Sequence, residues 1–141
     1  MTCITPLDLL MPLPSVACSL IQDSPVEAPT LSISRYFLLL VLTCFLEAPV
    51  YWFFAKGLSA RARVVQNLLL NLATHPAVTW GLPYLFLKAR FSTYVWGAEA
   101  FAWFVEALIL FRLYRYPKGK ALAVSALANL TSWWVGLLIL G

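Results

Sequence analysis

Four long apolar stretches follow one another through most of the chain, and short polar or basic links separate them. Each stretch has about 20 residues or slightly more, the length that an α-helix needs to cross the hydrocarbon core of a bilayer. We therefore expect an all-α fold, an integral membrane four-helix bundle that occupies residues 34–141. The predicted spans lie at about residues 36–55, 64–87, 93–114 and 121–140.

The first 33 residues have a different pattern, because prolines interrupt their apolar runs at positions 6, 12, 14, 25 and 29. A proline inside a helix removes a backbone hydrogen bond and clashes with the preceding turn. The start of the chain has no basic residue and carries Asp8, which is not typical of a signal peptide. We expect residues 1–33 to form a separate, irregular or interfacial segment outside the cytoplasm.

The composition agrees with a membrane protein. Of the 141 residues, 62% are hydrophobic and 11% are charged, whereas soluble domains have about 45–50% apolar and about 25% charged residues. The formal net charge of +4 is typical of basic cytoplasmic loops. No basic patch interleaved with aromatic residues indicates nucleic-acid binding. We expect the lipid bilayer as a partner and no nucleic acid.

The basic residues predict an orientation. Three of them, Arg35, Lys88 and Arg90, fall on one side of the predicted bundle. The other side has seven, which lie in the loops after the first and third spans: Lys56, Arg61, Arg63, Arg112, Arg115, Lys118 and Lys120. By the positive-inside rule, loops 56–63 and 112–120 are cytoplasmic and both termini lie outside. We expect the cell (inner) membrane of a bacterium.

Polar side chains recur within the apolar stretches at helical spacing. Residues three, four or seven positions apart lie on one face of a helix, and a polar face in an apolar helix should point away from lipid. The predicted polar core has eight members: Glu47, Asn67, Asn71, His75, Glu99, Glu106, Ser125 and Asn129. Three prolines are predicted to kink the spans, namely Pro49, Pro76 and Pro83.

Two segments of the chain resemble each other. The letters FLEA at 45–48 match FVEA at 104–107, and NLAT at 71–74 matches NLTS at 129–132. The asparagine follows the glutamate by 24 positions in one case (71 − 47) and by 23 in the other (129 − 106), with a basic loop between them each time. This pattern predicts two parallel two-helix repeats, related by an axis along the membrane normal.

The two glutamates and the two asparagines should lie at similar depth. With a rise of about 1.5 Å per residue, each is roughly 10–12 Å from the cytoplasmic end of its span. One interpretation is that Glu47–Asn71 and Glu106–Asn129 are structural clasps, since interhelical hydrogen bonds in membranes average about 0.6 kcal/mol. The other is that buried ionisable groups line a proton or cation path.

Other chemistry has less support. A single histidine with carboxylates would suit a hard or borderline cation, but no HExxH-type spacing is present, so we expect no metal and no cofactor. No serine or cysteine is placed by sequence beside His75 as a nucleophile. A glutamate with His75 could supply acid–base chemistry to a lipid or isoprenoid, although nothing in the sequence selects an enzyme.

A longer motif carries a resemblance. It consists of NxxTHPxxxW at 71–80, EA at 106–107 and SxxANxxS at 125–132. The chain resembles small uncharacterised bacterial polytopic membrane proteins over most of residues 45–136, which implies a multi-pass protein but no particular activity.

We expect an accessory or assembly subunit, or a small transporter-like unit. The alternative is an intramembrane enzyme that acts on a lipid or isoprenoid through His75 and a glutamate. Because a four-helix monomer of this size has a thin interior, we also expect a homo-oligomer or a larger membrane complex.

Overall fold

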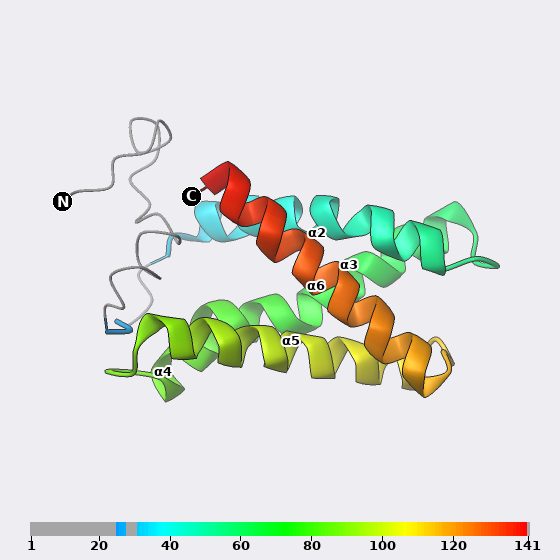
Figure 1. Ribbon diagram of the computed structural model, residues 1–141. Helices are drawn as coiled ribbons and strands as arrows, with labels where there is room; N and C mark the ends of the chain where they lie inside the picture. Colours follow the sequence, from blue (N-terminus) through cyan, green and yellow to red (C-terminus); the bar gives the residue numbers. More distant parts are fainter. Residues whose placement is uncertain (1–24, 28–30, 141) are drawn as a thin grey trace.

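The computed structural model describes residues 25–27 and 31–140, and in this part of the chain the regular structure is helical. Four long helical segments succeed one another, and Figure 1 shows them packed side by side. They are α2 (Ile33–Phe54); α3 (Ala60–Pro76), which continues into the π-helix η1 (Ala77–Gly81) and the short α4 (Leu82–Leu85); α5 (Phe91–Arg112); and α6 (Lys118–Leu140). The all-α class is confirmed for the described residues.

Serine side chains begin two of the helices. The Ser32 hydroxyl accepts from the backbone N–H of Arg35 at 3.4 Å, and the Ser59 hydroxyl accepts from that of Ala62 at 3.3 Å. These bonds satisfy N–H groups that have no partner within the helix. The loop before Ser59 turns at Gly57, whose φ of 100° is readily adopted only by glycine.

The prolines have different effects. Helix α2 continues through Pro49 to Phe54. Pro76 is the last residue of α3, and the π-helical turn η1 follows it directly. Pro83 lies in the first turn of α4, directly after η1. The change of helix type in the second segment therefore coincides with Pro76.

The helices form a closed ring of contacts in the order α2, α3, α5, α6. The α2–α3 and α5–α6 connections lie at one end of the bundle (Figure 1). The link from α4 to α5, the start of α2 and the end of α6 lie at the other. The buried core includes Tyr51, Leu70 and Leu110, packed with the small residues Ala121 and Ala128 of α6. Small residues let helices approach closely.

A short piece of the N-terminal segment is tied to this second end. The backbone N–H of Val26 donates to the carbonyl of Ala89 at 3.0 Å, and the N–H of Lys88 donates to the carbonyl of Val26 at 3.3 Å. Val26 is buried. The predicted segment boundary, between 33 and 34, falls at the start of α2. Most of residues 1–33, with its predicted irregular structure, lies outside the described residues.

Two of the helices, α2 and α5, are long and apolar enough to cross a membrane. Their most apolar windows have mean hydropathies of 1.9 and 1.4. Large apolar side chains are also exposed around the bundle, among them Phe45 at 75%, Leu85 at 79% and Leu138 at 79% of their surface. Exposed apolar surface of this extent marks a site of protein or membrane interaction. The two helices could therefore cross a membrane, and the exposed apolar surface fits contact with lipid or with another protein.

Gly97 on α5 permits a close contact that offers a test of this packing. A Cβ atom there would lie 2.6 Å from the Phe86 ring, whereas one at Gly136 on α6 would meet nothing within 4 Å. Removing a glycine from a helix stabilises it by roughly 0.5–1 kcal/mol when nothing clashes. We expect Gly136→Ala to raise the thermal unfolding temperature in detergent and Gly97→Ala to lower it. Equal effects of the two substitutions would contradict the Phe86 contact.

Candidate functional site

Two buried glutamates are each bound by the asparagine of the following helix. Asn71 Nδ2 donates to Glu47 Oε2 at 2.7 Å, and Asn129 Nδ2 donates to Glu106 Oε2 at 2.7 Å. All four side chains are buried. A buried carboxyl group without donors would be costly, so each asparagine stabilises its glutamate and joins two helices.

One turn before each asparagine, a polar side chain forms a hydrogen bond to the backbone of the helix that carries the glutamate. Asn67 Nδ2 donates to the carbonyl of Cys44 at 2.6 Å, and the Ser125 hydroxyl donates to that of Trp103 at 2.9 Å. Cys44 and Trp103 each precede their glutamate by three positions. The two hairpins, α2–α3 and α5–α6, therefore use the same pair of contacts at corresponding positions.

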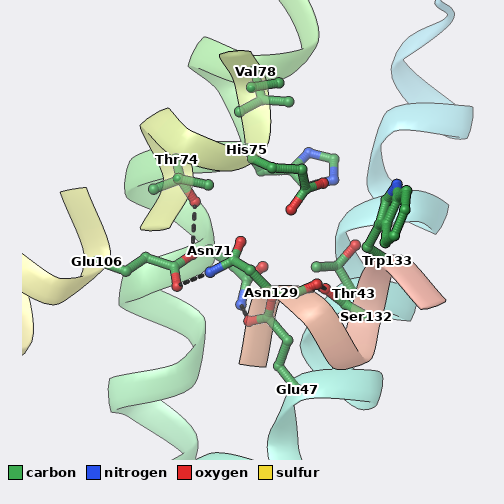
Figure 2. A pocket seen from close by; sticks show the side chains of 13 residues that line it. Thr43, Glu47, Asn71, Thr74, His75, Val78, Glu106, Asn129, Ser132 and Trp133 are labelled. Atoms are coloured by element: carbon green, nitrogen blue, oxygen red, sulfur yellow. Dashed lines mark hydrogen bonds between the residues drawn. The ribbon is translucent and has the colours of Figure 1, made fainter. Parts of the chain in front are cut away.

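Hydroxyl groups connect the hairpins to each other. The Thr74 hydroxyl on α3 is 3.3 Å from Glu106 Oε1 on α5, and the Ser132 hydroxyl on α6 is 3.2 Å from Glu47 Oε1 on α2. Each hydroxyl follows its asparagine by three residues. Each glutamate thus accepts hydrogen bonds from its own hairpin and from the other one. Figure 2 shows these side chains converging from separate helices.

The two glutamates differ in the number of donors. Glu106 accepts two more hydrogen bonds, from the Tyr51 hydroxyl at 2.9 Å and from the Ser125 hydroxyl at 3.2 Å. Within the described part of the chain Glu47 has only Asn71 and Ser132. Glu106 is therefore the more firmly held of the two carboxyl groups, and Glu47 has more freedom to interact with a ligand.

The aliphatic hydroxyls can serve either protonation state of the carboxyl groups. Thr74 is also 3.1 Å from the carbonyl of Leu70, and Ser132 is 3.0 Å from the carbonyl of Asn129. A hydroxyl has one proton and two lone pairs. When its proton points to the backbone carbonyl, its oxygen can accept a hydrogen bond from the O–H of a neutral carboxyl group. When the proton points to the glutamate, the hydroxyl donates to the carboxylate and stabilises it.

A cavity of about 180 Å³ adjoins this network. Three carboxyl groups line it, those of Glu47, Glu99 and Glu106, together with the imidazole of His75. No lysine or arginine is among its described lining residues. The cavity is therefore acidic, and apolar helices surround it.

His75 is held at the edge of the cavity (Figure 2). Its Nδ1 is 3.2 Å from the Thr79 hydroxyl. Its ring packs edge-on against Tyr36, with 5.2 Å between centroids, and Tyr36 in turn stacks on Trp80 at 4.2 Å. The corresponding position in the second hairpin is Trp133, which lines the same cavity.

The structure brings most of the predicted polar core together. Six of its members line the cavity: Glu47, Asn71, His75, Glu99, Glu106 and Asn129. The other two, Asn67 and Ser125, are buried beside it and orient the asparagines. Sequence reasoning missed Tyr51, Thr74 and Ser132. The shared spacing of Asn-x-x-Thr and Asn-x-x-Ser carried a signal for the last two.

In the described part of the chain, no group of three or more His, Cys, Asp or Glu side chains is arranged to hold a metal ion. Comparisons with protein-family models, curated proteins and solved structures found no match to this chain. The chemistry of the site therefore has to be argued from its own groups. These can hold and exchange protons, and they can attract a cation.

The unequal donor sets predict unequal effects of removing the two asparagines. Asn71→Leu leaves Glu47 with Ser132 as its described donor, whereas Asn129→Leu leaves Glu106 with three. We expect Asn71→Leu to lower the free energy of unfolding by about 1–3 kcal/mol, the usual cost of an unsatisfied buried group, and Asn129→Leu to lower it by less. Unfolding in mixed micelles measures both. A larger loss for Asn129→Leu would contradict the assignment.

Proposed function

We propose that this chain is a multi-pass membrane protein whose four helical segments all cross the bilayer. The candidate spans α2 and α5 support this, because α3 and α6 run alongside them in the same ring of contacts. The seven basic residues lie in the α2–α3 and α5–α6 connections and in the helix turns next to them, at one end of the bundle (Figure 1). In this proposal that end faces the cytoplasm, both termini lie outside, and the membrane is the cell (inner) membrane of a bacterium.

The hydrogen bonds support two parallel two-helix repeats. Glu47, Asn71 and Thr74 correspond to Glu106, Asn129 and Ser132, and every bond from an asparagine or hydroxyl of one set to a glutamate has a counterpart in the other. The matching contacts of Asn67 and Ser125 extend the correspondence. An axis along the membrane normal would relate the hairpins.

Within this framework the protein is a small transporter-like unit that carries protons or a cation through the membrane. The single observation that carries this proposal is the acidic cavity, where three carboxyl groups meet between apolar helices without a lysine or arginine among the described lining residues. Ionisable groups within a membrane are costly and mark ion pathways and proton relays. The rotating hydroxyls provide the partners that a carboxyl group needs in either protonation state.

The size of the cavity favours a small ligand. At about 180 Å³ it is smaller than the 300–1,000 Å³ typical of pockets for drug-sized molecules, so a lipid or isoprenoid substrate for His75 is less well supported. A role as an accessory or assembly subunit, as a homo-oligomer or in a larger complex, is compatible with the exposed apolar surface. An assembly role does not explain why three carboxyl groups line the cavity.

Proton flux into vesicles tests the proposal. We expect the full-length protein, reconstituted in liposomes that contain a pH-sensitive dye, to dissipate an imposed pH gradient when a permeant counter-ion is present. Glu47→Gln should reduce this flux to the rate of protein-free vesicles, because the carboxyl group that exchanges the proton is lost. Glu106→Gln should also reduce it, since the same cavity loses a second carboxyl group.

Glu27→Gln is the matched control, because Glu27 is exposed and lies outside the helices. It replaces a carboxyl group by an amide in the same way and should leave the flux unchanged. Circular dichroism of each variant confirms that the helices are intact. A folded Glu47→Gln protein that dissipates the gradient as fast as the unsubstituted chain would contradict a transport role for the cavity.

A further inference from the structure

A second hollow lies between α5 and α6. It is an apolar groove of about 350 Å³. Three tryptophans line it, Trp96 and Trp103 from α5 and Trp133 from α6, and its polar lining residues are Glu99 and Asn129. The small residues Ala100 and Ala126 also line the groove.

The groove and the acidic cavity share a wall. Glu99, Asn129 and Trp133 line both. Glu99 is half-buried and lies two helical turns before Glu106 on the same helix. A ligand in the groove would therefore reach a carboxyl group that also belongs to the cavity. The groove is placed to act as a side entrance between α5 and α6.

The two polar lining residues of the groove differ: Asn129 is hydrogen-bonded to Glu106 and Ser125, whereas the Glu99 carboxyl group is left for a ligand. Within the described residues no hydrogen bond to the Glu99 carboxyl group is found. The indole nitrogen of Trp133 has no partner there either, but it is buried and therefore closed to a ligand. In contrast, Trp103 is fixed by its Nε1, which donates to the carbonyl of Leu122 at 2.8 Å. The rings of Trp96 and Trp133 lie 5.7 Å apart at an angle of 46°, so they present two faces at an angle to each other.

The first hairpin lacks these features at the corresponding positions. Leu40 stands where the second hairpin has Glu99, Cys44 where it has Trp103, and Leu68 where it has Ala126. These substitutions replace the carboxyl group with an alkyl group and add bulk at the position of the small alanine. The first hairpin packs into the bundle without these features. Packing alone therefore does not explain the tryptophans, the carboxyl group and the free space of the second hairpin.

We propose that the groove binds a hydrophobic organic cation, such as a quaternary ammonium ion with an aromatic substituent. The faces of tryptophan rings attract cations, and aromatic cages bind quaternary ammonium groups in this way. The Glu99 carboxylate supplies the opposite charge, and the apolar walls disfavour a small hydrated ion. The claim that the protein transports this cation rests on the proposed function. The claim that the groove binds it depends only on the residues that line the groove.

A pair of isosteric probes tests the inference with the full-length protein in detergent micelles. Benzyltrimethylammonium and neopentylbenzene have the same shape and differ in that only the first is charged. We expect isothermal titration calorimetry to show saturable binding of the cation and weaker binding of the neutral probe. Glu99→Gln should weaken cation binding roughly tenfold, because it removes the opposite charge, and Glu27→Gln should not change it.

Ala126→Leu provides a second variant, because it places in the groove the residue that the first hairpin has at this position. It should abolish binding of both probes by filling the space. If neopentylbenzene binds as tightly as benzyltrimethylammonium, or if a folded Glu99→Gln protein binds the cation unchanged, the inference is overturned and the groove is one for lipid chains.

The flux assay separates this inference from the proposed function. If benzyltrimethylammonium binds in micelles but does not stimulate proton flux in vesicles, the binding site is supported and this cation is excluded as a transported substrate. Absence of binding would overturn the cation site, even if the vesicles showed flux that depends on Glu47.

Discussion

Two carboxyl groups buried among apolar helices impose the main constraint on this structure. Each needs hydrogen-bond donors, because an unsatisfied polar group in a low-dielectric interior costs more than a bond contributes. The donors to Glu47 come from α3 and α6. Those to Glu106 come from α2, α3 and α6. A shift of any one helix along its axis would break at least one of these bonds, so the network fixes the relative heights of the four helical segments.

The two hairpins share this network and differ around it. The first contributes Tyr51, which adds a donor to Glu106, and His75, which lines the cavity next to Thr79. The second contributes Glu99 and Trp133 at positions where the first has Leu40 and His75. The common residues hold the bundle together and also line the cavity, where the proposed transport depends on Glu47 and Glu106. The differing residues of the second hairpin line the groove, on which the proposed cation binding depends.

Much of this arrangement could be predicted from the sequence, for a physical reason. Asn71 and Asn129 stand out because an amide in an apolar helix needs a partner, and the nearly equal spacing after Glu47 and Glu106 identifies the partner within each hairpin. The bonds of Thr74 and Ser132 could not be predicted, because their partners lie on the other hairpin and depend on how the two pack. The groove depends likewise on how α5 and α6 lie against each other. Pro76 indicated an irregularity, but not that η1 would continue the segment in π-helical form.

The bonds between the hairpins are the most direct test of the account, because they alone connect the two halves through the glutamates. A double-mutant cycle of Glu47→Leu with Ser132→Ala, measured by unfolding in mixed micelles, isolates the contact between α2 and α6. The account predicts a favourable coupling of about 0.6 kcal/mol or more, as for other interhelical bonds in membranes. The control cycle pairs Glu47→Leu with Thr131→Val, whose hydroxyl donates to Leu127 of its own helix, and should show no coupling. Equal couplings in both cycles would contradict the hydrogen bond between Ser132 and Glu47.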